Sequence, residues 1–176
     1  QAGIIQTSQS MELLDLSAAF SSLPLPHGNR VAILTLGGGW GVVASDLCAE
    51  NGLIVPRLSQ GIIEKINGLL PPFWSHANPV DLVAEMNTDV HMAIIEELLQ
   101  WEECDAIIHM GIIGRKVMIR SVLQSTVTVD KSYDPKMVAD NLELLKIYEQ
   151  GLVEKTVRIM GKYHKPVIGV YLLTDE

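Results

Sequence analysis

The sequence lacks the features that are typical of membrane-spanning, secreted and metal-binding proteins. It has no apolar run of the roughly 18 residues that a membrane-spanning helix requires, and it opens without the basic and apolar leader of a secreted protein. Its two cysteines, Cys48 and Cys104, lack the spacing of a metal site and are expected to be buried and reduced, as in a cytoplasmic protein. Basic residues number 13 against 21 acidic ones, a net charge of −8. We therefore expect neither a membrane nor nucleic acid as a partner.

The sequence also lacks a recognisable catalytic apparatus. None of its five histidines stands at metal-ligand spacing from a carboxylate or a cysteine. His109 lies in a segment expected to be a buried strand, where a hydrogen-bonded structural histidine is the default. His76 lies in a loop beside Asn78 and is the one histidine to test, although a structural role is favoured for it too. We predict no catalytic residue and no metal ligand.

Apolar residues make up 48% of the 176, enough for one domain with a real core. Residues 30–36 form a continuous apolar run, which is typical of a strand covered on both faces of a parallel sheet. Predicted strands and helices then alternate, which indicates an open sheet with helices on both sides. The predicted strands are residues 30–36, 53–55, 79–83, 105–113 and 167–173, and the predicted helices are residues 42–50, 59–70, 89–101 and 135–161. The predicted fold class is α/β, a flavodoxin-like three-layer fold with a five-stranded, mostly parallel sheet; residues 114–131 are not assigned.

Residues 1–28 are expected to precede this domain, which covers residues 29–176. A helix capped by Ser10 carries Leu13, Leu14, Leu16 and Phe20 on its expected inner side. A proline-rich linker follows it up to residue 28. We expect residues 1–28 to be a linker helix that continues from an upstream domain, and the chain to be part of a longer protein.

Two groups of glycines stand at the ends of predicted strands. Gly37, Gly38, Gly39 and Gly41 lie between the first strand and a helix, where free N–H groups and the helix dipole favour an anion. This spacing is neither the dinucleotide fingerprint nor a P-loop. The alternative is a tight turn without a ligand.

The second group lies at the same edge of the predicted sheet. Gly111 and Gly114 end the fourth predicted strand and precede Arg115 and Lys116. We predict that all six glycines bind phosphate in one concavity; the alternative for this pair is a turn with solvated basic residues.

Asn78 precedes a short predicted strand, and Asp81 falls near the carboxyl end of that strand, at the same edge of the sheet. We expect both to support the site. An Asx-type turn or a helix cap is the alternative.

Taken in order, these pieces resemble the last ligase domain of the alpha part of ADP-forming acyl-CoA synthetases, a family similar to succinyl-CoA synthetase. The most specific combination is the glycine cluster followed by Asn78-Pro79-Val80-Asp81-Leu82. The resemblance also rests on residues 3–8, 12–16, 25–35, 51–53 and 69–72, and it weakens between residues 115 and 131. Two departures stand out: Leu36 and Trp40 replace an asparagine and a proline that are frequent in the family, and the indole is expected to narrow the pocket.

The resemblance implies a reaction in which acid, CoA and ATP give acyl-CoA, ADP and phosphate. An ATP-grasp domain phosphorylates a histidine, which passes the phosphoryl group to the acid before CoA displaces phosphate. The family's Ser-His-Thr-Gly segment does not occur in this chain, so no histidine here inherits that role. The implied role of this domain is to help form the docking site of the phosphohistidine.

The implied partners are the CoA-binding and ATP-grasp domains of the same enzyme. CoA, ATP and Mg would be bound by the parent enzyme and not by this domain alone, which is expected to be inactive in isolation. The alternatives are a small-molecule-binding or regulatory module, a scaffold, and a domain of a protein lysine acetyltransferase. The acid, the choice of ATP or GTP and the oligomeric state stay open.

Overall fold

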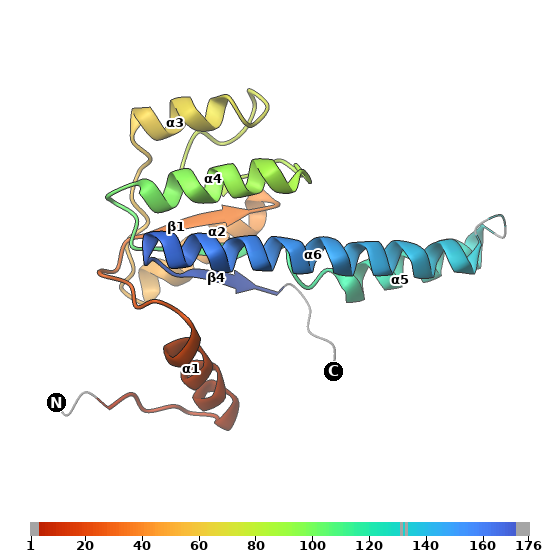
Figure 1. Ribbon diagram of the computed structural model, residues 1–176, viewed down its shortest axis with the longest axis horizontal. Helices are drawn as coiled ribbons and strands as arrows, with labels where there is room; N and C mark the ends of the chain where they lie inside the picture. The colour runs from red at the N-terminus through yellow and green to blue at the C-terminus, as the bar shows by residue number, and fades with distance from the viewer. Residues whose placement is uncertain (1–3, 131, 133, 172–176) are drawn as a thin grey trace.

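The computed structural model describes residues 4–130, 132 and 134–171, and in that part of the chain the central element is a parallel sheet. It consists of β1 (Val31–Thr35), β2 (Val80–Asp81), β3 (Ala106–Met110) and β4 (Val167–Val170), in the order β2-β1-β3-β4. All three strand pairs are parallel (Figure 1). The predicted α/β class and parallel sheet are therefore confirmed. Residues 172–173 of the last predicted strand lie outside the described residues.

The predicted count of five strands is wrong, because the second predicted strand is reduced to one bridge. Only Ile54 pairs with the sheet, through a parallel bridge to Arg30 at the start of β1. The next ladder positions of β1 are taken by a side chain: Asn78 Nδ2 donates to Val31 O at 3.0 Å, and Asn78 Oδ1 accepts from Ile33 N at 2.9 Å. Pro56 has no N–H with which to continue the ladder. One edge of β1 is therefore shared by Ile54, the Asn78 amide and β2.

Helices cover both faces of the sheet and give the expected three layers. On one face, α2 (Gly38–Glu50) packs Ala44 and Cys48 against Val31 and Ile33. The other face carries the larger core, which α3 (Gln60–Asn67), α4 (Thr88–Gln100) and α6 (Pro135–Tyr163) share with it. Ser59 caps α3 as expected by accepting from Ile62 N.

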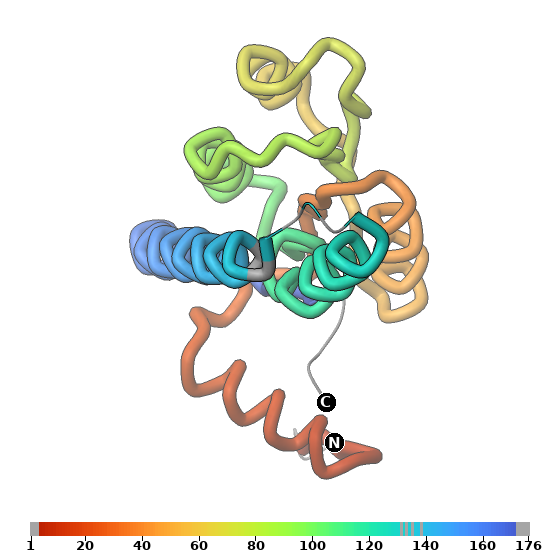
Figure 2. Tube along the Cα trace, turned by 90° about the vertical axis from the view of Figure 1, so that its right-hand side faces the viewer, coloured from red at the N-terminus to blue at the C-terminus, as the bar shows by residue number. Residues whose placement is uncertain are grey.

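The unassigned stretch contains a helix, α5 (Lys116–Val129), which pairs with α6. Asp134 caps α6 by accepting from Lys136 N at 2.8 Å, and Pro135 stands in its first turn, as predicted. The two helices run side by side and extend beyond the sheet (Figures 1 and 2). The start of α5 and the middle of α6 lie at the edge of the sheet where β3 stops.

Both cysteines are buried and free, as expected. Cys104 donates to Ala106 O at 3.3 Å, and burial raises the pKa of its thiol to about 11. Burial also raises the pKa of Cys48. Neither thiol has the lowered pKa of a reactive cysteine.

The helix α1 (Ser10–Ser22) does not pack as expected. Its N-cap is Gln9 and not Ser10, and it has no buried residue. Leu13, Leu14 and Phe20 are each more than half exposed, and Figure 1 shows α1 apart from the sheet. The expected inner side of this helix therefore has no partner among the described residues. The boundary between residues 28 and 29 stays a prediction.

Within the described residues, no helix is long and apolar enough to cross a bilayer.

Candidate functional site

The two glycine groups lie side by side at the carboxyl edge of the sheet. Thr35 and Met110, the last residues of β1 and β3, are register partners. One residue further, Leu36 N donates to Met110 O at 3.2 Å. The turns that leave these two strands therefore start next to each other, at the edge where open α/β sheets bind ligands.

The first turn is shorter than predicted, because α2 begins at Gly38 and not at Val42. Gly37 is the N-cap, and Thr35 Oγ1 both donates to Gly37 O at 3.0 Å and accepts from Gly37 N at 3.3 Å. Gly38 and Gly39 are exposed. Among the described residues, their N–H groups have no hydrogen-bond partner. The free, positively polarised end of a 13-residue helix thus faces outward at this edge.

The glycines of this turn differ in the space around them. A Cβ at Gly41 would lie 2.9 Å from Pro79 Cβ, and one at Gly38 would lie 2.8 Å from Asp81 Oδ2. A Cβ at Gly39 would meet nothing within 4 Å. Gly38 and Gly41 therefore let α2 approach β2 closely, whereas Gly39 stands beside open space.

The two supporting residues play different parts. Asp81 Oδ1 accepts from Val83 N at 2.9 Å, the Asx-type contact that was the alternative, while Oδ2 lies beside Gly38. The Asn78 side chain makes a third hydrogen bond to the backbone, because its Nδ2 also donates to Pro56 O at 3.1 Å. Asn78 therefore shapes the edge through β1, and Asp81 places a negative charge at the start of α2. Trp40 is 49% exposed, and its ring edge lies beside Gly37.

The second turn holds its N–H groups against a carboxylate of α6. Gly111 and Gly114 have φ of 79° and 78°, the left-handed region that favours glycine. A Cβ at Gly114 would also collide with the ring of Tyr171. Gly114 N donates to Glu149 Oε2 at 3.1 Å, and Arg115 N donates to Glu149 Oε1 at 3.2 Å. Glu149 thus caps α5 from a distant part of the chain.

Arg115 is buried, which contradicts the alternative of solvated basic residues at this turn. Its side chain is 4% exposed, and Nε lies 3.6 Å from Glu149 Oε1. Nη1 contacts Met86 Sδ at 3.3 Å, and the guanidinium lies 5.7 Å from the centre of the Tyr148 ring. Among the described residues, Nε and Nη2 have no hydrogen-bond partner.

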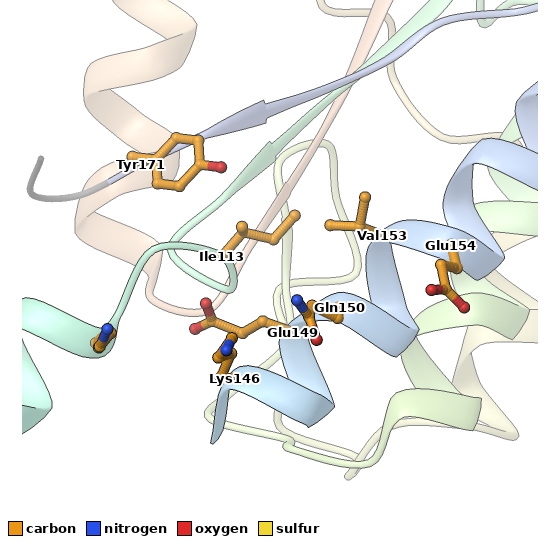
Figure 3. Close-up of a pocket in the computed structure, with 8 residues that line it drawn as sticks. Ile113, Lys146, Glu149, Gln150, Val153, Glu154 and Tyr171 are labelled. Atoms are coloured by element: carbon orange, nitrogen blue, oxygen red, sulfur yellow. The ribbon is translucent and has the colours of Figure 1, made fainter. Parts of the chain in front are cut away.

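A pocket of about 450 Å³ opens beside this turn, between α5, α6 and the end of β4 (Figure 3). It is lined by Ile113, Lys116, Lys146, Glu149, Gln150, Val153, Glu154 and Tyr171. The role of Glu149 could not be predicted from the sequence. Glu149 lies in a helical segment 34 residues after Arg115, and no local pattern there indicates that its side chain caps α5.

The two histidines considered above, His76 and His109, have different surroundings. His76 is exposed and its ring lies 4.7 Å from that of Trp74, centre to centre. His109 is 2% exposed, and its Nε2 has no partner among the described residues, so the expected hydrogen bond of a structural histidine is not found at that atom. Burial, and to a lesser degree nearby His91, lowers the pKa of His109 to about 3. The described residues contain no group of three side chains that could hold a metal ion.

A family model described as the Ligase-CoA domain matches residues 31–131, more than half of the chain. The chain belongs to the Ligase-CoA domain family. The match starts at the first residue of β1 and includes both glycine groups.

Sequence relatives of this Ligase-CoA domain are named ADP-forming ligases. It is 34% identical over 113 residues to the acetate–CoA ligase (ADP-forming) II subunit alpha of Pyrococcus furiosus, covering 64% of this chain and 24% of that protein. It is 26% identical over 161 residues to the 4-hydroxybutyrate–CoA ligase (ADP-forming) of Nitrosopumilus maritimus, covering 92% of this chain and 22% of that protein. The resemblance to ADP-forming acyl-CoA synthetases is confirmed, and the chain spans about a quarter of the length of these relatives.

Solved structures share the fold. A protein from Pyrococcus horikoshii OT3 matches with a TM-score of 0.59 at 23% identity, over 94% of this chain and 38% of that one. The dinucleotide-forming acetyl-coenzyme A synthetase 1 of Ca. Korarchaeum cryptofilum, in complex with phosphate and ADP, matches with a TM-score of 0.56 at 22% identity, over 92% and 39%. At this level of identity the likeness extends to the fold alone.

Proposed function

We propose that this Ligase-CoA domain helps to form the docking site of a phosphohistidine in an ADP-forming acyl-CoA synthetase. The parent enzyme would convert acid, CoA and ATP to acyl-CoA, ADP and phosphate. The phosphorylated histidine would lie in a Ser-His-Thr-Gly segment outside this chain. CoA, ATP and Mg would be bound by the parent enzyme, which would also contain CoA-binding and ATP-grasp domains. The two buried, free cysteines support a cytoplasmic setting.

The observation that carries this proposal is the free start of α2. The N–H groups of Gly38 and Gly39 are exposed and, among the described residues, without a partner. A phosphoryl group there would be stabilised by about 0.3–1 kcal/mol at an exposed helix end, and by up to about 2 kcal/mol if partly buried. Because the neutral, unphosphorylated histidine gains none of this, the site favours and positions the phosphorylated form without a side chain acting as acid or base.

Asp81 decides on which side of the turn the phosphoryl group would lie. Its Oδ2 stands beside Gly38, and two negative charges at this separation repel each other. The phosphoryl group therefore belongs on the side of Gly39, where the space is open. Gly111 and Gly114 would contribute the neighbouring helix end, that of α5, whose donors are engaged by Glu149 in this structure.

Replacing Gly39 by Asp and by Asn tests this proposal in the complete enzyme. The two side chains are near-isosteres, and both find open space at this position. The aspartate adds a negative charge where the phosphoryl group would dock, so Gly39→Asp should lower phosphohistidine formation about tenfold or more relative to Gly39→Asn. Phosphohistidine formation and melting temperature are measured for both variants.

Equal loss of phosphorylation in both variants at unchanged melting temperatures, or loss in neither, would contradict the docking proposal. The glycines would then serve only as a tight turn, and the edge would be an inert surface between domains. A lower melting temperature in both variants would identify a folding defect as the cause of a shared loss.

A further inference from the structure

The N-terminus of α5 is already occupied by an anion that belongs to the protein itself. The two oxygens of Glu149 accept one N–H each from consecutive residues, at 3.1 Å from Gly114 and 3.2 Å from Arg115. A bound phosphate would accept from the same pair of N–H groups. Glu149 reaches this position from the middle of α6, across 34 residues of chain from Arg115.

The buried Arg115 side chain shows that this position is built for negative charge. Its Nε lies 3.6 Å from the same Glu149 oxygen that accepts the Arg115 N–H. The side chain is 96% buried, and its Nε and Nη2 lack a hydrogen-bond partner among the described residues. A buried guanidinium with unused donors requires a nearby anion, and Glu149 meets that requirement only in part.

We propose that Glu149 closes the α5 end of the docking site and that an incoming phosphoryl group must displace it. The inference rests on the proposed function for the identity of the displacing group. The site would then open only to a strong anion, because a neutral imidazole offers one acceptor nitrogen and no negative charge to the two N–H groups and Arg115. A phosphoryl group carries about −1.5 to −2 charges and can compete with the single charge of a carboxylate. Glu149 thereby restricts the α5 end to the phosphorylated partner.

The pocket beside the turn provides room for the displaced carboxylate. Glu149 lines it together with Lys116 at the start of α5 and Lys146 one turn earlier on α6 (Figure 3). A rotation of the Glu149 side chain into this space keeps it near a positive charge.

The test follows the backbone amides of the 176-residue chain by NMR while inorganic phosphate is added, with chloride at matched ionic strength as the blank. Gly38 and Gly39 report on the start of α2, and Gly114 and Arg115 report on the start of α5. We expect Gly114 and Arg115 to respond in Glu149→Ala at a phosphate concentration about tenfold lower than in the wild type. Glu154→Ala, which removes another carboxylate from the same pocket, should behave as the wild type.

The outcomes separate this inference from the proposed function. If the Gly114 and Arg115 amides respond at the same phosphate concentration in the wild type and in Glu149→Ala, the closure by Glu149 is contradicted. This holds for any response of the Gly38 and Gly39 amides. A response of Gly114 and Arg115 without one of Gly38 and Gly39 supports the closure and contradicts docking at α2. No response at any of the four amides contradicts both. If Glu149→Ala does not fold, the phosphate response of Glu149→Gln is compared with that of the wild type instead. Glutamine keeps the shape of the side chain without its charge.

Discussion

At the scale of single residues, Arg30 and Asp105 form a charged contact at the opposite end of the sheet from the site. Asp105 accepts from Arg30 N at 3.0 Å, from Nε at 2.8 Å and from Nη2 at 2.8 Å. The hydrogen bonds from Arg30 lower the pKa of Asp105 to about 2, against an ordinary value of 3.8. This pair ties the start of β1 to the start of β3, and so fixes the register that brings the two glycine turns together.

Replacing Arg30 by Met should therefore lower the free energy of unfolding by about 2 kcal/mol near pH 7, the value of a charge-assisted pair that leaves a buried carboxylate behind. Because the folded-state pKa of Asp105 is below its unfolded-state pKa, its contribution is present above about pH 4 and lost as the pH falls toward 2. Urea unfolding at pH 7 and pH 2.5 measures both effects. The difference between variant and wild type should shrink at the lower pH.

Lys65→Met is the matched control. Lys65 pairs with Glu97 across α3 and α4, but its side chain is 52% exposed, so its loss should cost less than about 1 kcal/mol. If the two variants lose the same stability, the Arg30–Asp105 pair does not have the role given to it here.

At the scale of elements, the edge of β1 depends on one side chain. Asn78 supplies to Val31 O and Ile33 N the hydrogen bonds that a fifth strand would otherwise supply, and it also donates to Pro56 O. Asn78→Ala should lower the free energy of unfolding by about 3 kcal/mol, because it leaves an N–H and two carbonyls of a buried region unpaired. Chemical denaturation measures this loss.

Two further variants test whether the amide itself matters. Asn78→Asp keeps the acceptor for Ile33 N but turns a carboxylate toward two carbonyl oxygens, so it should not restore stability. Asn51→Ala removes an exposed amide that bonds only Leu47 O at the end of α2, and should change stability little. A mild effect of Asn78→Asp would show that the bonds to the carbonyls contribute nothing.

The elements that the sequence predicted well are those with strong local signals. Caps at Ser59 and Asp134, the proline at the start of α6 and the apolar runs of β1 and β3 are all local features, and each was confirmed. The fifth strand failed because its partner position is filled by the Asn78 side chain, which strand patterns do not reveal. The prediction that one side of α1 is buried was wrong. An apolar pattern shows which side of a helix can be buried, but it does not show whether another element packs against that side.

In the candidate site, too, local patterns could be predicted from the sequence, whereas contacts between distant segments could not. The position of both glycine groups at one edge follows from the parallel alternation of strands and helices, and could be predicted. The contact of Glu149 with Gly114 could not, because it joins segments 35 residues apart through a helix pair that the sequence left partly unassigned. The burial of Arg115 follows from that same helix pair.

At the scale of the whole molecule, we propose that the domain presents a docking edge, and we expect it to have no acyl-CoA synthetase activity on its own. The described part of the chain holds no group of metal ligands, and its two most buried histidines lie inside the core. The chain spans about a quarter of the length of relatives that are named ADP-forming ligases. We therefore expect no thioester when the 176-residue chain is incubated with acid, ATP and CoA.

The most direct measurement is reconstitution of phosphohistidine formation. The complete enzyme from which residues 29–176 have been deleted is mixed with ATP, and the 176-residue chain is added in its wild-type form, as Gly39→Asn or as Gly39→Asp. We predict little phosphohistidine without the chain, recovery with the wild type and with Gly39→Asn, and about tenfold less recovery with Gly39→Asp. Full phosphorylation in the absence of the chain, or equal recovery with Gly39→Asp and Gly39→Asn, would contradict it.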